Sequence, residues 1–141
     1  MARPAKRSPP RPEQAALRAL RVADRSRAEL EARLARQGVA EAERRRTLDE
    51  LERLGYLDDA RTAKLRAARL AERGYGDAYI RADLQRRGLA AEAALAELEP
   101  ESRRAAHLVA ERGAGASTAT WLARRGFGED CLEAAFAAEP P

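Results

Sequence analysis

A leucine placed four residues before a glycine recurs three times in this chain and constrains its fold more than any other feature. It appears in ELEARLARQGV (29–39), YIRADLQRRGL (79–89) and TATWLARRGF (118–127), and a second core candidate precedes each leucine by four residues. Residues four apart share one face of a helix, and glycine closes helices in the left-handed conformation. The pattern therefore predicts three short amphipathic helices that end before Gly38, Gly88 and Gly126.

The sequence also predicts one helix before and one helix after each of these three. Apolar residues recur after every glycine, and helix-forming segments precede the three motifs at residues 13–23, 59–73 and 101–112. Ser26 and Glu29 form a capping-box pattern, and Pro100 fits the first position of a helix. Short units of this kind stabilise one another by stacking. We predict three tandem three-helix, helix-turn-helix-like repeats in an elongated, curved array, over residues 13–57, 58–98 and 99–141.

The composition predicts an all-α fold. Of the 141 residues, 35% are charged and 4% are aromatic, so the core candidates are mostly alanine and leucine. Alanine, leucine, arginine and glutamate are strong helix formers. No segment shows the alternation of β-branched and polar residues that is typical of a strand.

The first twelve residues differ from the rest of the chain. They contain Arg3, Lys6, Arg7 and Arg11, no acidic residue, and four of the seven prolines. Because these four charges equal the net charge of +4, the remaining residues are balanced. A segment that is basic, rich in proline and poor in apolar residues does not fold alone. We therefore predict a disordered basic arm over residues 1–12.

Positive charge also gathers in the middle of the chain. Residues 61–87 contain eight basic and three acidic side chains, whereas residues 99–141 contain five basic and seven acidic ones. Such a cluster is either a solvated helix face or a surface for an anionic partner. Basic residues just before the cap glycines have a second explanation, since cations favour helix C-termini. The binding candidates are Arg61, Lys64, Arg66, Arg69, Arg73, Arg81, Arg86 and Arg87, with Arg36, Arg124 and Arg125 near the other two glycines.

The sequence offers little for catalysis. In LGYLDDARTA (54–63), Asp58 and Asp59 are predicted to open a helix as its N-cap and first-turn acid, with Tyr56 and Leu57 packed beside them. The only histidine and the only cysteine lie far apart, and their spacing matches neither a catalytic pair nor a metal site. We expect no catalytic residues, no metal and no cofactor.

Two features predict a cytoplasmic protein without membrane contact. The single cysteine suits a reducing compartment. No apolar run is long enough to cross a bilayer, and no apolar run follows the N-terminal arginines as it does in a secretory signal.

The stretch LGYLDDARTAKLRAARLAERGYGDAYIRADLQRRGL (54–89) resembles the RecX regulators of bacterial RecA recombinase, and so does RSRAELEARLARQGV (25–39). The order of the motifs matches over about residues 13–138. Thr62 stands where the family usually has Phe or Tyr, and Asp77 stands where proline is usual, although Asp77 can still cap the next helix. The residues that carry the motifs are Gly55, Tyr56, Leu57, Asp58, Asp59, Gly74, Gly76 and Gly88.

The resemblance implies a monomeric, non-enzymatic regulator in DNA repair, homologous recombination and the SOS response. RecX-like proteins bind the RecA–DNA filament in its groove and limit its recombinase, ATPase and coprotease activities. Contact with single- or double-stranded DNA is then expected to be weak and non-specific.

A direct DNA-binding helix-turn-helix regulator is the alternative. The predicted second helices begin with Arg27-Ala28-Glu29, Asp77-Ala78-Tyr79 and Ala116-Ser117-Thr118. Acids at such positions lie near phosphates, so the sequence disfavours base-specific recognition.

Overall fold

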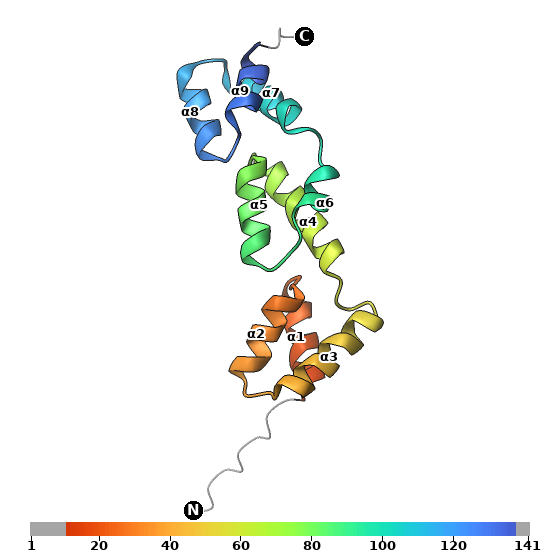
Figure 1. The fold of residues 1–141 in the computed structure, drawn as a ribbon. Coiled ribbons are helices and arrows are strands. Elements are labelled where there is room, and N and C mark those ends of the chain that lie inside the picture. Colours follow the sequence, from red (N-terminus) through yellow and green to blue (C-terminus); the bar gives the residue numbers. More distant parts are fainter. Residues whose placement is uncertain (1–10, 138–141) are drawn as a thin grey trace, which may run out of the picture. The chain divides into compact units, whose positions relative to one another are not determined.

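The computed structural model describes residues 11–137, and every regular element in that range is a helix (Figure 1). The all-α prediction is confirmed. The helices are α1 (Pro12–Val22), α2 (Arg27–Arg36), α3 (Glu41–Arg53), α4 (Asp59–Glu72), α5 (Asp77–Arg86), α6 (Glu92–Ala96), α7 (Glu101–Arg112), α8 (Ala116–Arg124) and α9 (Glu129–Ala137). None of them is long and apolar enough to cross a membrane.

The predicted basic arm lies almost wholly outside the described residues. Pro12 was assigned to the arm, but it is the first residue of α1. Proline is well suited to this position because the first turn of a helix does not use its own N–H groups.

The chain divides into two compact units, Met1–Asp58 and Asp59–Pro141. In the first unit, α1, α2 and α3 contact one another around a core of alanine and leucine. Leu30, Leu34 and Leu48 are fully buried there. The small alanines of α1 let the three helices approach closely.

The second unit contains two hydrophobic clusters. One lies where α4, α5 and α6 meet, and it includes Ala67, Ile80 and Leu84, all fully buried. The other lies where α7, α8 and α9 meet, around Ala105 and Leu122. In Figure 1 the first group runs from yellow-green to teal and the second from teal to blue. The first group is completed by the very short α6, which has five residues.

The three glycine-ended helices are confirmed in detail. Each glycine has a positive φ, +83° at Gly38, +74° at Gly88 and +90° at Gly126. The residue after each glycine donates its backbone N–H to the carbonyl of the predicted leucine, at 3.1, 2.9 and 3.2 Å. This six-to-one bond closes the helix in a Schellman motif. Local sequence alone thus determines where α2, α5 and α8 end.

The predicted helix starts are right in part. Ser26 Oγ accepts from the Glu29 N–H at 3.0 Å, and the Glu29 carboxylate accepts from the Ser26 N–H at 3.2 Å, so the capping box is confirmed. Helix α4 begins at Asp59, directly after Asp58, as predicted. Pro100 was predicted to be the first helical residue, but it is the N-cap and α7 begins at Glu101.

Two other local predictions are wrong. Asp77 was expected to cap α5, yet Gly76 is the N-cap and Asp77 is the first helical residue. The Asp77 carboxylate pairs with Arg104. Tyr56 was expected to pack beside the start of α4. Its neighbour Leu57 is buried in the first unit, whereas Tyr56 remains 55% exposed. Adjacent residues in a tight turn point to different sides, and only one of them reaches the core here.

Candidate interaction surface

The predicted binding residues of the chain's middle segment fall into two groups in the structure. Lys64, Arg66, Arg81, Arg86 and Arg87 form ion pairs with carboxylates. Arg61 and Arg69 on α4, and Arg73 just after it, are exposed. These ion pairs neutralise part of the positive charge that the composition of the segment indicates.

Asp83 pairs with three arginines. Its side chain is 7% exposed and accepts from Arg66 Nε at 2.5 Å and from Arg66 Nη2 at 2.9 Å. Arg87 Nε lies 3.3 Å and Arg86 Nη2 lies 3.5 Å from the same carboxylate. The forked pair holds α5 against α4, so Arg66 has a structural role whatever else it contacts.

Two further pairs tie α6 to its neighbours. Lys64 Nζ lies 2.9 Å from Glu97, and Arg81 Nε lies 2.7 Å from Glu92. All four side chains are at least 40% exposed. Exposed pairs of this kind stabilise a fold little and exchange readily with an incoming partner's charges.

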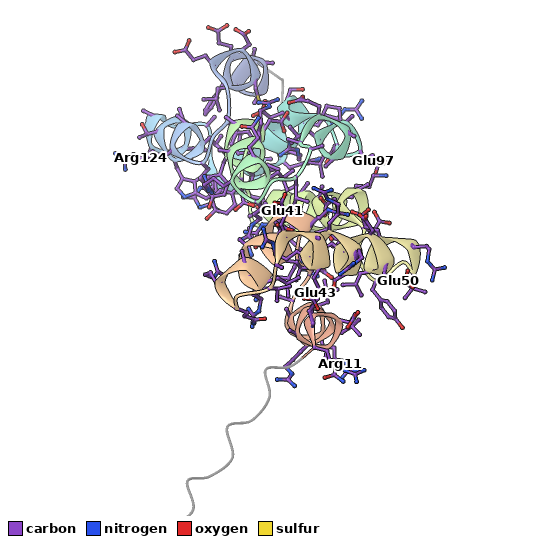
Figure 2. The ribbon with its side chains drawn as sticks, turned by 60° about the horizontal axis from the view of Figure 1, so that its bottom comes forward. Arg11, Glu41, Glu43, Glu50, Glu97 and Arg124 are labelled. Atoms are coloured by element: carbon purple, nitrogen blue, oxygen red, sulfur yellow. The ribbon has the colours of Figure 1, made fainter. Side chains whose placement is uncertain are left out.

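The basic residues near the cap glycines differ from one another. Arg36 and Arg124 are exposed and form no ion pair within residues 11–137. Arg124 projects outward from α8 (Figure 2). Arg125 is half-buried and donates from Nε to the carbonyl of Gly74 at 3.0 Å, and from Nη2 to the carbonyl of Arg73. Arg125 therefore joins α8 to the turn after α4.

Gly74 and Gly76, two glycines of the RecX-like motif, form this same turn. Gly74 has a φ of +85°, which favours glycine. Gly76 has an ordinary backbone conformation, but its N–H donates to the Arg125 carbonyl at 2.8 Å. A Cβ at Gly76 would lie 2.5 Å from the carbonyl carbon and oxygen of Gly126. The motif therefore serves the contact between the two helix groups of the second unit.

Arg104 also lies at this junction, but nothing in the sequence indicates its role there. It lies in a helical pattern where an exposed arginine is expected, yet only 9% of it is exposed. Its guanidinium donates to the carbonyls of Glu99 and Tyr75, at 2.9 and 3.0 Å, and to the Asp77 carboxylate. Because Tyr75 and Asp77 are nearly thirty residues away, only the folded structure identifies this role.

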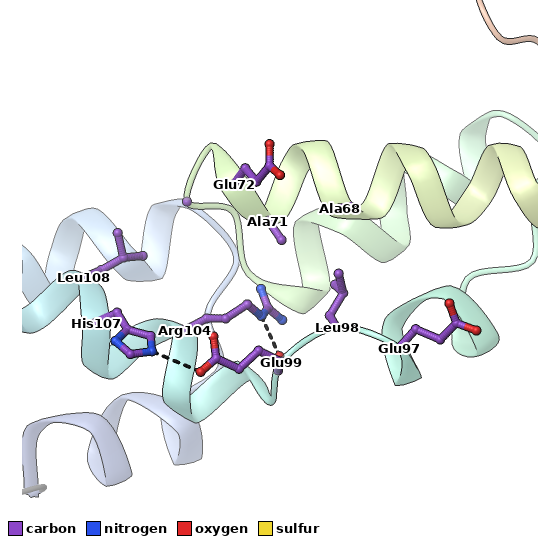
Figure 3. Close-up of a pocket in the computed structure, with 10 residues that line it drawn as sticks. Ala68, Ala71, Glu72, Glu97, Leu98, Glu99, Arg104, His107 and Leu108 are labelled. Atoms are coloured by element: carbon purple, nitrogen blue, oxygen red, sulfur yellow. Dashed lines mark hydrogen bonds and ion pairs between the residues drawn. The ribbon is translucent and has the colours of Figure 1, made fainter.

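A pocket of about 400 Å³ opens beside this junction, between α4, α7 and the segment that connects α6 to α7 (Figure 3). Ala68, Ala71, Leu98 and Leu108 supply its apolar lining. At its edge, His107 Nε2 lies 3.0 Å from Glu99 Oε1. The dashed lines in Figure 3 show that Glu99 also accepts from Arg104 through its carbonyl. The pocket is open and contains no arrangement of nucleophile and base.

The described residues hold neither a cluster of metal ligands nor an activated thiol. No group of three or more His, Cys, Asp or Glu side chains within residues 11–137 is placed to hold a metal ion. Burial, together with the nearby Glu101 carboxylate, raises the pKa of the Cys131 thiol to about 11. The thiol is therefore protonated near neutral pH and is a poor nucleophile. What the surface can do is contact anions through exposed guanidinium groups.

The Asp83 cluster predicts a specific pH dependence of stability. The hydrogen bonds from Arg66 hold the pKa of Asp83 below its usual value, despite its burial. A lowered native pKa stabilises the fold above the unfolded-state pKa, near 4, and this contribution is lost as pH falls through the native pKa. Asp83→Asn is expected to lower the free energy of unfolding by about 2 kcal/mol at pH 7, and the difference from the parent protein should shrink below about pH 4.

Urea denaturation at several pH values measures this effect. Glu92→Gln is the matched control, because it removes a carboxylate from an exposed pair with Arg81 on the same helix group. It should change stability little at any pH. An equal loss for both variants, or a loss in Asp83→Asn that persists at low pH, would contradict the assignment.

Comparison with known proteins identifies relatives along nearly the whole chain. No family model matches. A protein named Regulatory protein RecX from Xanthomonas oryzae pv. oryzae (strain MAFF 311018) is 33% identical over 142 residues, which cover 92% of this chain and 89% of the relative. One of the same name from Halorhodospira halophila is 34% identical over 137 residues, which cover 88% and 85%.

Solved structures agree on the fold. The crystal structure of RecX from Lactobacillus salivarius superposes with a TM-score of 0.76 at 19% identity, over 88% of this chain and 91% of that one. A second crystal structure, of a regulatory protein RecX, gives a TM-score of 0.72 at 17% identity and covers 86% of this chain. Identity above 30% along almost the full length of both sequences shows the family. The chain belongs to the RecX family of regulatory proteins.

Proposed function

We propose that this chain is a non-enzymatic regulator that binds the RecA–DNA filament in its groove and lowers the recombinase, ATPase and coprotease activities of RecA. In this role it acts in the cytoplasm as a monomer, in DNA repair, homologous recombination and the SOS response. It needs no cofactor and no metal. Its contact with single- or double-stranded DNA is weak and non-specific.

Membership of the RecX family is the observation that carries this proposal. The surface chemistry supports it. A nucleoprotein filament is anionic, and Arg69, Arg73 and Arg124 place guanidinium groups at the exposed surface of the second unit. The pairs of Lys64 with Glu97 and of Arg81 with Glu92 are exposed, so both cations can also turn to an acidic partner.

The organisation of the chain is part of the proposal. Three tandem three-helix repeats, over residues 13–57, 58–98 and 99–141, would form an elongated, curved array that contacts successive RecA protomers. A disordered basic arm over residues 1–12 would add charge at one end. Such an arrangement suits a helical polymer, because a repeated unit can meet a repeated surface.

The decisive experiment measures the single-stranded-DNA-dependent ATPase of RecA with this protein added below the RecA concentration. Direct binding to the same DNA is measured in parallel at about 50 and about 200 mM salt. We expect strong inhibition together with weak, salt-sensitive DNA affinity. No inhibition at any ratio would overturn the proposal. Inhibition only when the protein saturates the DNA would instead favour the direct DNA-binding regulator.

A charge-reversal variant connects the activity to the surface. Arg69→Glu with Arg73→Glu is expected to weaken inhibition and to leave helicity unchanged, because both side chains are exposed. Arg66 is kept, since its pair with Asp83 holds α4 and α5 together. Arg18→Glu with Arg21→Glu on α1 makes the same change in charge at exposed residues outside the candidate set. Equal effects of the two variants would indicate that only net charge matters.

A further inference from the structure

A column of stacked cationic and aromatic side chains runs across the junction of the second unit. The Arg112 guanidinium lies 3.8 Å above the Trp121 ring, and the Arg125 guanidinium lies 4.6 Å from the same ring centroid. Arg125 also lies 4.1 Å from the Tyr75 ring. Tyr75 in turn stacks on Tyr79, with centroids 3.9 Å apart and planes inclined by 13°. Five side chains from α5, α7, α8 and two connecting segments thus form one stack.

The geometry of this column is fixed by its surroundings. Arg125 is held by the carbonyls of Gly74 and Arg73 in addition to the two rings. Trp121 packs over Gly74, where a Cβ would lie 3.5 Å from the ring. Little side-chain freedom remains to be lost when a ligand binds.

Within residues 11–137, no carboxylate pairs with the cations at the column. Arg73, Arg112, Arg124 and Arg125 form no ion pair with any residue between 11 and 137, in contrast to the paired cations of α4 and α5. Arg112 and Arg124 are exposed. Arg124 follows Trp121 by three residues on α8, which places it on the same side of that helix.

A guanidinium that stacks on an aromatic ring keeps its charge and its outward N–H edge. Stacking satisfies the face of the group, whereas the N–H donors lie in its plane. Those donors match the oxygen atoms of a phosphate, which they bind in a forked geometry. Aromatic rings among such cations suit single-stranded nucleic acid, because bases stack on rings while phosphates meet the charges. An acidic protein segment would use the cations but has no use for the rings.

We propose that the column binds single-stranded nucleic acid, with phosphates on the exposed Arg112 and Arg124 and an unpaired base against the half-buried ring of Tyr79, which ends the stack. The proposal deepens the proposed function and rests on it for the choice of DNA as the ligand. It assigns the direct DNA contact to residues 73–125 of the second unit. Tyr79, Arg112 and Trp121 lie outside the basic residues that the sequence singled out.

Trp121 is the only tryptophan of the chain, so its fluorescence reports on this site alone. The experiment titrates the full chain, without RecA, with an oligothymidylate and follows both Trp121 emission and the anisotropy of a labelled strand. We expect saturable binding with a change in Trp121 emission, and tighter binding to the single strand than to a duplex of equal length. Binding without a Trp121 response, or equal binding to the duplex, would overturn the proposal.

A double variant tests the residues. Arg112→Ala with Arg124→Ala is expected to weaken binding about tenfold, and each lost contact should lower the slope of log affinity against log salt by about 0.7. Arg18→Ala with Arg21→Ala is the matched control, since both arginines are exposed on α1 and form no ion pair within residues 11–137. Equal losses in the two variants would contradict the assignment.

Competition with polyglutamate tests whether the column binds acidic protein segments instead of nucleic acid. Displacement of the oligonucleotide by the peptide at equal charge concentration would assign the column to acidic protein segments and overturn the proposal. Because RecA is absent from all these measurements, their failure is distinguishable from a failure of the filament assay. A protein that inhibits RecA yet leaves Trp121 emission unchanged on DNA would keep the proposed function and lose this site.

Discussion

Replacing Gly76 by alanine is expected to lower the free energy of unfolding of the second unit by about 3 kcal/mol, the upper range for an overpacked site. The added Cβ would lie 2.5 Å from the carbonyl group of Gly126 and from the Phe127 nitrogen. These are main-chain atoms, so no side-chain rotation relieves the contact. The clash would force α5 away from α8 and break the 2.8 Å hydrogen bond from Gly76 to Arg125.

Gly115 provides a matched control for this variant. Both glycines are N-caps, with φ of −86° and ψ of 172° at Gly76 and 169° at Gly115. A Cβ at Gly115 meets nothing within 4 Å. Gly115→Ala therefore includes the same loss of N-cap preference without the clash. Chemical denaturation followed by Trp121 fluorescence compares the two, and equal stabilities would show that the junction is looser than the structure indicates.

Arg104→Ala is expected to cost a similar amount, about 3 kcal/mol, because it removes one partner from a buried, hydrogen-bonded ion pair. The Tyr75 carbonyl would lose its donor, and the Asp77 carboxylate would lose its counter-ion. Arg104→Lys should restore only part of the loss, since a lysine cannot donate to three acceptors in the planar arrangement of a guanidinium.

The neighbouring Arg103 is the control for Arg104. Its side chain is exposed on the same helix and has the same charge. Arg103→Ala should change stability by less than about 0.5 kcal/mol. Thermal or chemical unfolding monitored by far-UV circular dichroism measures both variants. Similar losses at the two positions would mean that the buried guanidinium contributes no more than a surface arginine.

The helix ends and Gly76 illustrate what the sequence can and cannot predict. The ends of α2, α5 and α8 follow from contacts between residues at most five apart, so the leucine–glycine spacing was sufficient to predict them. The glycine at position 76 was recognised as part of a motif. Its physical reason, the approach of Gly126, depends on a contact across fifty residues and is visible only in the fold.

The basic binding candidates stay predictions, but folding gives several of them partners that the sequence does not indicate. Arg66 looks like an ordinary surface arginine in the sequence, but folding brings Asp83 to it. Counting charges between residues 61 and 87 therefore overestimated the free positive charge there. It also missed the column around Trp121, since residues 99–141 are acidic on average. The net charge of a segment says little about where unpaired charges meet after folding.

The junction within the second unit rests partly on main-chain atoms. Gly76 donates to the Arg125 carbonyl and Ala78 donates to the Gly126 carbonyl, at 2.8 and 3.2 Å. Hydrogen bonds of this kind do not depend on which side chains the four residues carry, provided that nothing larger than hydrogen separates the two backbones at the glycines. For these main-chain bonds, evolutionary constraint should therefore fall on the two glycines that permit the approach rather than on side-chain chemistry.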